Sequence, residues 1–166
     1  MERFSRSIEK VVRLFAKLSA LLVIFLSLLV VYDALNRYLL HGGSVALQEL
    51  EWHLFDIIFL LGLSYTLQMD KHVRVDIFYA SFSKKTKALI EIISQLLMIL
   101  PFTFLVLYVS WDFVMQSYLQ HEISADPGGL THRYLIKGMI IAGFILLGLQ
   151  SIVLLWKNIK IFKGEA

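Results

Sequence analysis

The sequence has no cysteine and few charged residues. Without cysteine it can form no disulfide, no thiolate metal site and no cysteine nucleophile. Charged residues make up 17% of the 166 positions, against roughly 25% in typical soluble domains, while hydrophobic residues make up 58%. Such a chain cannot cover its apolar surface with polar groups. We therefore expect lipid or other protein around it.

Motifs for catalysis and nucleotide binding are also missing. The glycines do not form GxGxxG or GxxxxGK[ST], and nothing resembles a nucleophile–base set or a metal-ligand cluster. We expect neither an enzyme nor an ATPase. The net charge of +3 is compatible with nucleic-acid binding, but the basic residues are placed as in membrane proteins. We therefore expect no nucleic-acid partner.

Four long apolar stretches dominate the chain. A spanning helix needs about 20 apolar residues, because ~1.5 Å per residue must cover a ~30 Å hydrocarbon core. Residues 92–111 and 138–156 are uncharged over that length, whereas the first two stretches carry charges near the membrane edge. Since barrel-type alternation is absent, each stretch must be helical. We predict one all-α integral membrane domain with four transmembrane helices over 18–40, 49–70, 89–115 and 134–157.

In residues 1–17 the basic residues recur every three or four positions, as on one side of a helix. The apolar residues fall largely opposite the cations, which predicts an amphipathic helix lying at a lipid interface. A solvated basic leader is the alternative interpretation. No small-x-small cleavage site follows, so we expect an uncleaved anchor rather than a signal peptide. The cations are Arg3, Arg6, Lys10, Arg13 and Lys17.

The distribution of Lys and Arg predicts the topology. The N-terminal segment, the connection over 71–88 and the C-terminal tail hold all of these residues except three, namely Arg37, Arg133 and Lys137. We predict both termini and the 71–88 connection on the cytoplasmic side, with that connection dipping into the headgroup region. The run Asp126-Pro127-Gly128-Gly129 predicts a tight turn on the outer face.

Charged residues lie near the outer ends of the first two spans. An ionised side chain at mid-bilayer costs roughly 2.5–3.5 kcal/mol on insertion scales, so such residues normally face protein or water. Asp33 and Arg37 are four apart and can pair, and Glu49 or Glu51 can reach Arg37 across the short first loop. Asp56 is the deepest acid. A proton or ion relay is one interpretation. Ion pairs that hold helices or dock a partner are favoured, because the charges are not at mid-span.

Histidine placement bears on a haem-binding redox anchor. A four-helix membrane cytochrome needs paired histidines on facing helices, and only His53 lies inside a predicted span. This disfavours haem. His72 and Asp76 are a local pairing candidate in the cytoplasmic connection.

Pro101 interrupts the third apolar stretch. It removes one helical hydrogen bond and should kink or loosen that turn. A kink can mark a gate, but a role in shaping helix packing is favoured.

Several short segments, taken in order, resemble the small membrane subunit of TRAP (tripartite ATP-independent periplasmic) transporters. Their order, their spacing and the four spans carry the resemblance over about residues 15–155. The segments are Asn36–Tyr38, Glu49–Phe55, Leu61–Gly62, His72–Asp76 and Asp126–Leu130, followed by Arg133, Lys137 and Gly143–Phe144.

The resemblance implies a non-catalytic role in a sodium-driven importer. In that family a separate large permease carries the substrate and sodium sites, and a periplasmic binding protein delivers an organic anion. The small subunit packs on the permease in the bacterial cytoplasmic membrane, with lipids as its other neighbours. We expect no cofactor here, because sodium would bind the large subunit.

The same resemblance gives the outer-face charges a role. Arg37, Glu49, Glu51, Asp126 and Arg133 would contact the permease or the delivering protein. Two alternatives stay open at this point. A stand-alone four-helix exporter would need an acid at mid-span, whereas Asp33 lies toward a helix end. A redox anchor would need the paired histidines discussed above.

Overall fold

The computed structural model describes residues 2–69 and 82–165 and is all-helical across them. Four helical rods are long and apolar enough to cross a membrane. The elements are α1 (Glu2–Leu39), α2 (Val45–Gln68), α4 (Lys84–Ser94), the π-helical turn η1 (Gln95–Ile99), α5 (Leu100–Leu119) and α6 (Tyr134–Lys163). The predicted class, an all-α protein with four candidate spans, is confirmed.

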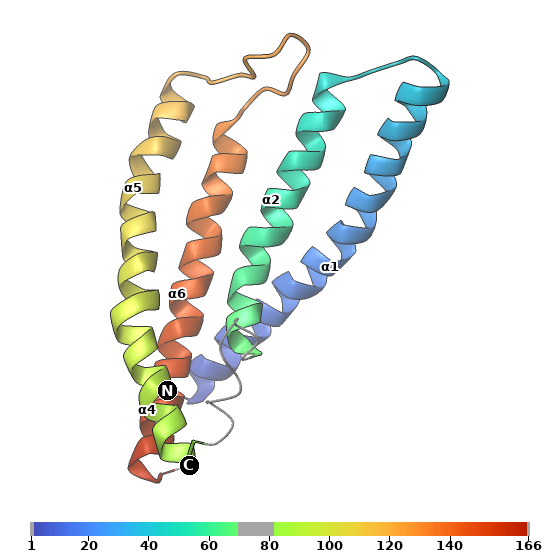
Figure 1. The fold of residues 1–166 in the computed structure, drawn as a ribbon. Coiled ribbons are helices and arrows are strands. Elements are labelled where there is room, and N and C mark those ends of the chain that lie inside the picture. The colour runs from blue at the N-terminus through green and yellow to red at the C-terminus, as the bar shows by residue number, and fades with distance from the viewer. Residues whose placement is uncertain (1, 70–81, 166) are drawn as a thin grey trace.

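The rods form a row rather than a closed bundle. Figure 1 shows the order α5, α6, α2, α1, in which α6 packs on α5 and α2, and α2 packs on α6 and α1. The connections 40–44 and 120–133 lie at one end of the row, called here the loop end. Both termini lie near the other, called here the terminal end (Figure 1). Which end faces the cytoplasm stays a prediction.

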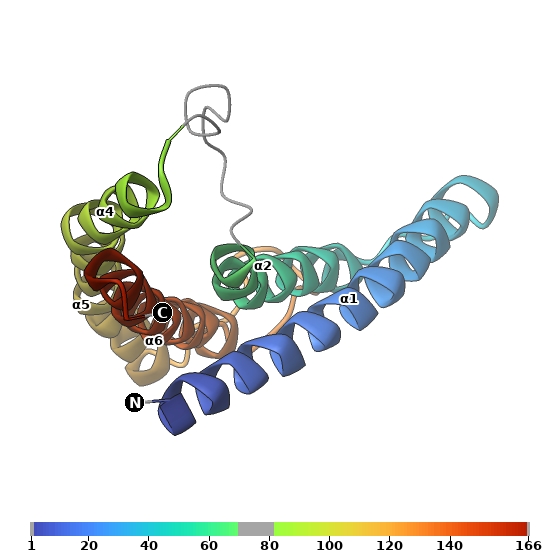
Figure 2. The same ribbon diagram turned by 90° about the horizontal axis from the view of Figure 1, so that it is seen from below.

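Helix α1 is one unbroken rod of 38 residues, about 57 Å at ~1.5 Å per residue. It therefore joins the predicted interfacial segment (1–17) and the predicted first span without a break. Figures 1 and 2 show α1 inclined across α2. At the terminal end α1 reaches α6, where Lys157 pairs with Glu9, and Lys160 lies 3.4 Å from Glu2. That residues 1–17 lie on a lipid surface stays a prediction.

Helix ends follow from local sequence. Ser44 precedes α2, and its hydroxyl accepts a hydrogen bond from the Leu47 amide at 3.4 Å. Ser83 caps α4 in the same way through the Thr86 amide at 3.1 Å. A side-chain oxygen at this position satisfies one amide that has no partner within the helix. Gly164 ends α6 with φ of +78°, the left-handed conformation that glycine adopts most readily.

Pro101 lies at the second position of α5, directly after the π-turn. The Leu100 amide donates to the Gln95 carbonyl five residues back, not to the one four back. Proline has no amide hydrogen, so the helical ladder must loosen beside it, and a π-turn is one way to do so. The loosening predicted from the sequence thus takes the form of one widened turn.

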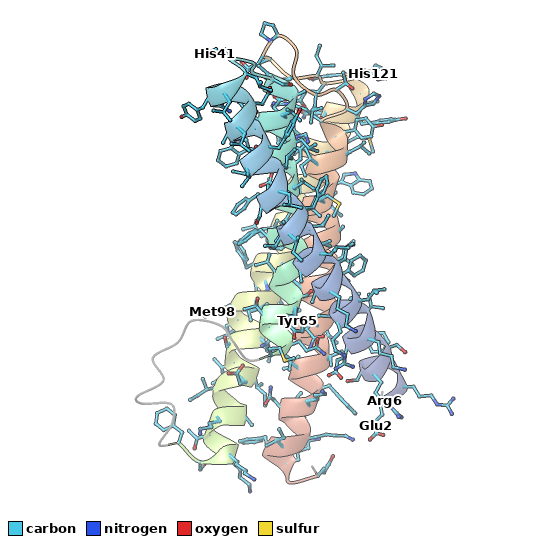
Figure 3. All side chains as sticks on the ribbon, turned by 90° about the vertical axis from the view of Figure 1, so that its right-hand side faces the viewer. Glu2, Arg6, His41, Tyr65, Met98 and His121 are labelled. Carbon is cyan, nitrogen blue, oxygen red and sulfur yellow. The ribbon has the colours of Figure 1, made fainter. Side chains whose placement is uncertain are left out.

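The interior of the row is thin and partly polar. Gly143 of α6 meets Leu60 of α2 so closely that a Cβ there would come within 2.9 Å of the Leu60 backbone oxygen. Gln95 and Ser151, both buried, form a 2.5 Å hydrogen bond between η1 and α6. Many large apolar side chains point outward instead. Figure 3 shows side chains projecting along the whole height, from His41 and His121 at the loop end to Glu2 and Arg6 at the terminal end.

Candidate functional site

A carboxylate at the loop end ties α2 to the 120–133 connection. Glu49, largely buried, accepts hydrogen bonds from the Ser124 hydroxyl, from the Leu130 amide at 2.5 Å and from the Arg133 guanidinium at 2.6 Å. Its two oxygens thereby hold a side chain, a main-chain amide and a cation from beyond α5. One carboxylate positions the whole connection over the loop-end turns of α2.

The glycines of the predicted turn make this arrangement possible. Gly128 has φ of +82°, and the Gly129 amide donates to the Asp126 carbonyl at 3.0 Å, which closes the turn. A Cβ on Gly129 would lie 2.4 Å from the Ser124 hydroxyl and 2.8 Å from a Glu49 carboxylate oxygen. Only a residue without a side chain fits at position 129. We call Glu49, Ser124, Gly129, Leu130 and Arg133 together the Glu49 network.

A second ion pair closes the same connection. Lys137 at the start of α6 pairs with Glu122, and its ammonium lies 4.0 Å from the centre of the Phe113 ring. The hydrogen bond from Lys137 holds the pKa of Glu122, in the connection outside the helices, below its ordinary value. Both cations at the loop end of α6, Arg133 and Lys137, are therefore engaged within the chain.

The acids of α1 and α2 form one of the ion pairs predicted from the sequence but not the other. Asp33 is buried and pairs with Arg37 on the same helix, as their spacing of four allows. The sequence offered Arg37 as the partner of Glu49 or Glu51. Instead Glu49 pairs with Arg133, because the 120–133 connection folds over α2. One buried oxygen of Glu51 has no hydrogen-bond partner among the described residues, although Asp33 and Arg37 both act on it electrostatically.

An open cavity of about 400 Å³ lies beside the Glu49 network, between α2 and α6 at their loop ends. Trp52, His53 and Asp56 line it from α2, and Asp126 lines it from the connection. Within the described part of the chain, the carboxylates of Asp56 and Asp126 have no hydrogen bond and no ion pair. Asp56, the deepest of the acids singled out from the sequence, therefore faces an open cavity.

The remaining predicted pair, His72 and Asp76, lies outside the described residues. Sequence reasoning missed the partners Ser124 and Glu122, as well as the Gln95–Ser151 bond. Glu122 and Lys137 carry opposite charges on either side of the same predicted turn, which was a usable signal. A polar side chain within each of two uncharged stretches, Gln95 and Ser151, was another. Glutamines inside spans often hydrogen-bond across helices.

Among residues 2–69 and 82–165, no group of three His, Asp or Glu side chains is arranged to hold a metal ion. The loop-end groups that the structure brings together are ion pairs and hydrogen bonds that connect helices. Such groups are suited to holding helices together and to binding another protein.

Comparison with known proteins gives one family. A family model described as "Tripartite ATP-independent periplasmic transporters, DctQ component" matches residues 26–161, most of the chain. The match covers α2 to α5 entirely and most of α6, and it begins within the half of α1 that is nearer the loop end. No curated protein matches the chain.

Proposed function

Because this chain belongs to the DctQ component family of tripartite ATP-independent periplasmic transporters, we propose that it is the non-catalytic subunit that packs on and supports a large permease. Membership makes it the small membrane component of such a transporter and implies two partners, a large permease and a substrate-binding protein. The match over residues 26–161 carries the proposal.

The proposed transporter imports an organic anion with a sodium gradient. The large subunit holds the substrate and the sodium, and this chain binds no cofactor. It lies in the bacterial cytoplasmic membrane, with the loop end outside and both termini inside. The excess of Lys and Arg at the terminal end supports this orientation.

The arrangement of the helices in a row is consistent with a subunit that packs on a large permease. The two faces of the row expose many large apolar side chains, and the few buried polar groups of its central helices include Ser151, which hydrogen-bonds to Gln95 of η1. A stand-alone exporter is less well supported, since Asp33, its first-helix acid, pairs with Arg37.

Reconstitution tests the proposal. The tagged chain is purified in mild detergent from cells that also express its large subunit, and is then placed in liposomes with the binding protein and a labelled organic anion. We expect the large subunit to co-purify, and uptake to require both membrane subunits and an inward sodium gradient. Uptake by this chain alone, or no recovery of the large subunit, would overturn the proposal.

A further inference from the structure

One side of α2 combines aromatic rings with a carboxylate. Trp52, Phe55 and Phe59 are 69%, 52% and 57% exposed, and Asp56 is also exposed. Their spacings of three and four residues place them on one side of the helix. We call this surface, with the two hollows described next, the Asp56 face.

Two hollows follow each other along this face. The first is the cavity at Asp56 and His53 described above. The second, of about 370 Å³, is entirely apolar and is lined by Phe59 and Leu63 of α2, Ile99 of η1, Phe102 of α5, and Phe144 and Leu147 of α6. Residues 52, 56, 59 and 63 repeat with the helical period, so the two hollows lie on one side of α2. We call the two hollows together the groove, which is polar near the loop end and apolar below.

The depth of Asp56 matters for what can cover it. Asp56 is one helical turn from Leu60, which contacts Gly143 within the uncharged stretch 138–156 of α6. Asp56 therefore lies at about the level where that stretch begins. A carboxylate at this depth is costly against acyl chains, so it normally meets a polar or cationic partner.

The charges of the groove select the partner's sign. The two cations beside it are already engaged, Arg133 by Glu49 and Lys137 by Glu122. The carboxylates of Asp56 and Asp126 remain without partners in the described chain, so the groove has an excess of negative charge. An anionic lipid headgroup would meet repulsion here. A second copy related by a two-fold axis through this face would bring Asp56 toward Asp56.

We propose that the Asp56 face is the docking surface for the large membrane subunit. A helix of that subunit brings a Lys or Arg side chain to Asp56 and places aliphatic or aromatic side chains in the apolar hollow. The inference rests on the proposed function and deepens it, by naming the face and the chemistry of the partner.

Photo-crosslinking in membranes tests which face docks. A photoreactive phenylalanine analogue replaces Phe59, and in matched variants it replaces Phe25 of α1 or Phe104 of α5, which are 52% and 72% exposed. The variants are expressed together with the large subunit. We expect strong crosslinking to the large subunit from position 59 and weak crosslinking from positions 25 and 104. Crosslinks from position 59 to lipid or to a second copy, or preferred crosslinking from position 25 or 104, would overturn the proposal.

Charge reversal tests the partner's sign. We expect Asp56→Lys to lower recovery of the large subunit roughly tenfold, because like charges would meet across the contact. Asp112→Lys, near the outer end of α5, should leave recovery unchanged. A melting curve of each purified chain checks folding. Normal recovery with Asp56→Lys would exclude a cationic partner.

The wild-type pull-down separates the two proposals. If the wild-type chain recovers no large subunit, the proposed function fails. If the wild type recovers it and Asp56→Lys does so equally well, only the assignment of this face fails.

Discussion

Two acids of the same helix, seven residues apart, meet opposite surroundings. Glu49 is largely buried and accepts hydrogen bonds from three groups of its own chain, one of them a cation. Asp56 is exposed and has no partner within the described residues. Both lie on α2 and both line the same cavity. The first holds the chain together, whereas the second is available to something outside it.

The comparison also separates two kinds of surface. Around Glu49, the 120–133 connection supplies donors, and Gly129 leaves room for them. Around Asp56, the cavity is open, and no described side chain hydrogen-bonds to the carboxylate. A carboxylate that completes its hydrogen bonds internally marks a structural site. One that lacks them suits the docking surface proposed above for the large membrane subunit.

The largest expected effect comes from breaking the satisfied acid. Glu49→Gln cannot pair with Arg133, and its amide nitrogen would face donors. We expect the melting temperature of the purified chain in detergent to fall by roughly 5 °C. Asp56→Asn, the matched change, should move it by less than about 1 °C, because no contact within the described chain is lost. Equal shifts for the two variants would remove the distinction between them.

A smaller effect is expected from the glycine that admits the network. Gly129→Ala places a Cβ 2.4 Å from Ser124, so the connection must move away from Glu49. We expect the melting temperature to fall by roughly 3 °C. Gly43→Ala is the control, since nothing lies within 4 Å of its Cβ position. An unchanged melting temperature for Gly129→Ala would show that the connection tolerates the shift and does not depend on this fit.

The sequence predicted the class, the four spans and the family because apolar stretches and segment order are local properties. It also predicted the Asp33–Arg37 pair, which depends only on a spacing of four along one helix. It did not predict that Glu49 pairs with Arg133. That contact joins residues 84 positions apart and depends on how the 120–133 connection folds over α2, and periodicity carries no information about it.

The row arrangement was equally beyond periodicity. Each helix is apolar around most of its circumference, so its sequence does not say which sides meet helices and which meet lipid or another subunit. The Leu60–Gly143 contact shows how α2 and α6 meet, but a glycine in an apolar stretch is compatible with many packings. The free side of Asp56 becomes visible only once the neighbours of α2 are known.

The smallest expected effect is a loss of stability at the loop end as the pH falls. The pKa of Glu122 is lowered in the fold, chiefly by the hydrogen bond from Lys137. A carboxyl with a lowered pKa contributes stability that is fully present above its unfolded value of about 4.3 and is lost as the pH falls through the folded value.

We therefore expect Lys137→Met to lower the melting temperature by about 2 °C at pH 7 and by less at pH 3, because lowering the pH toward the pKa of Glu122 weakens the same contact in the wild type. The control is Lys85→Met, which removes an exposed cation of α4 at the terminal end and should give equal shifts at both pH values. The measurement is a melting curve of each purified variant at several pH values between 7 and 3. A Lys137→Met shift that stays constant across this range would mean that the Glu122 carboxylate contributes nothing to stability. The loop end would then be held by Glu49 alone, and the contrast with Asp56 would rest on that one side chain.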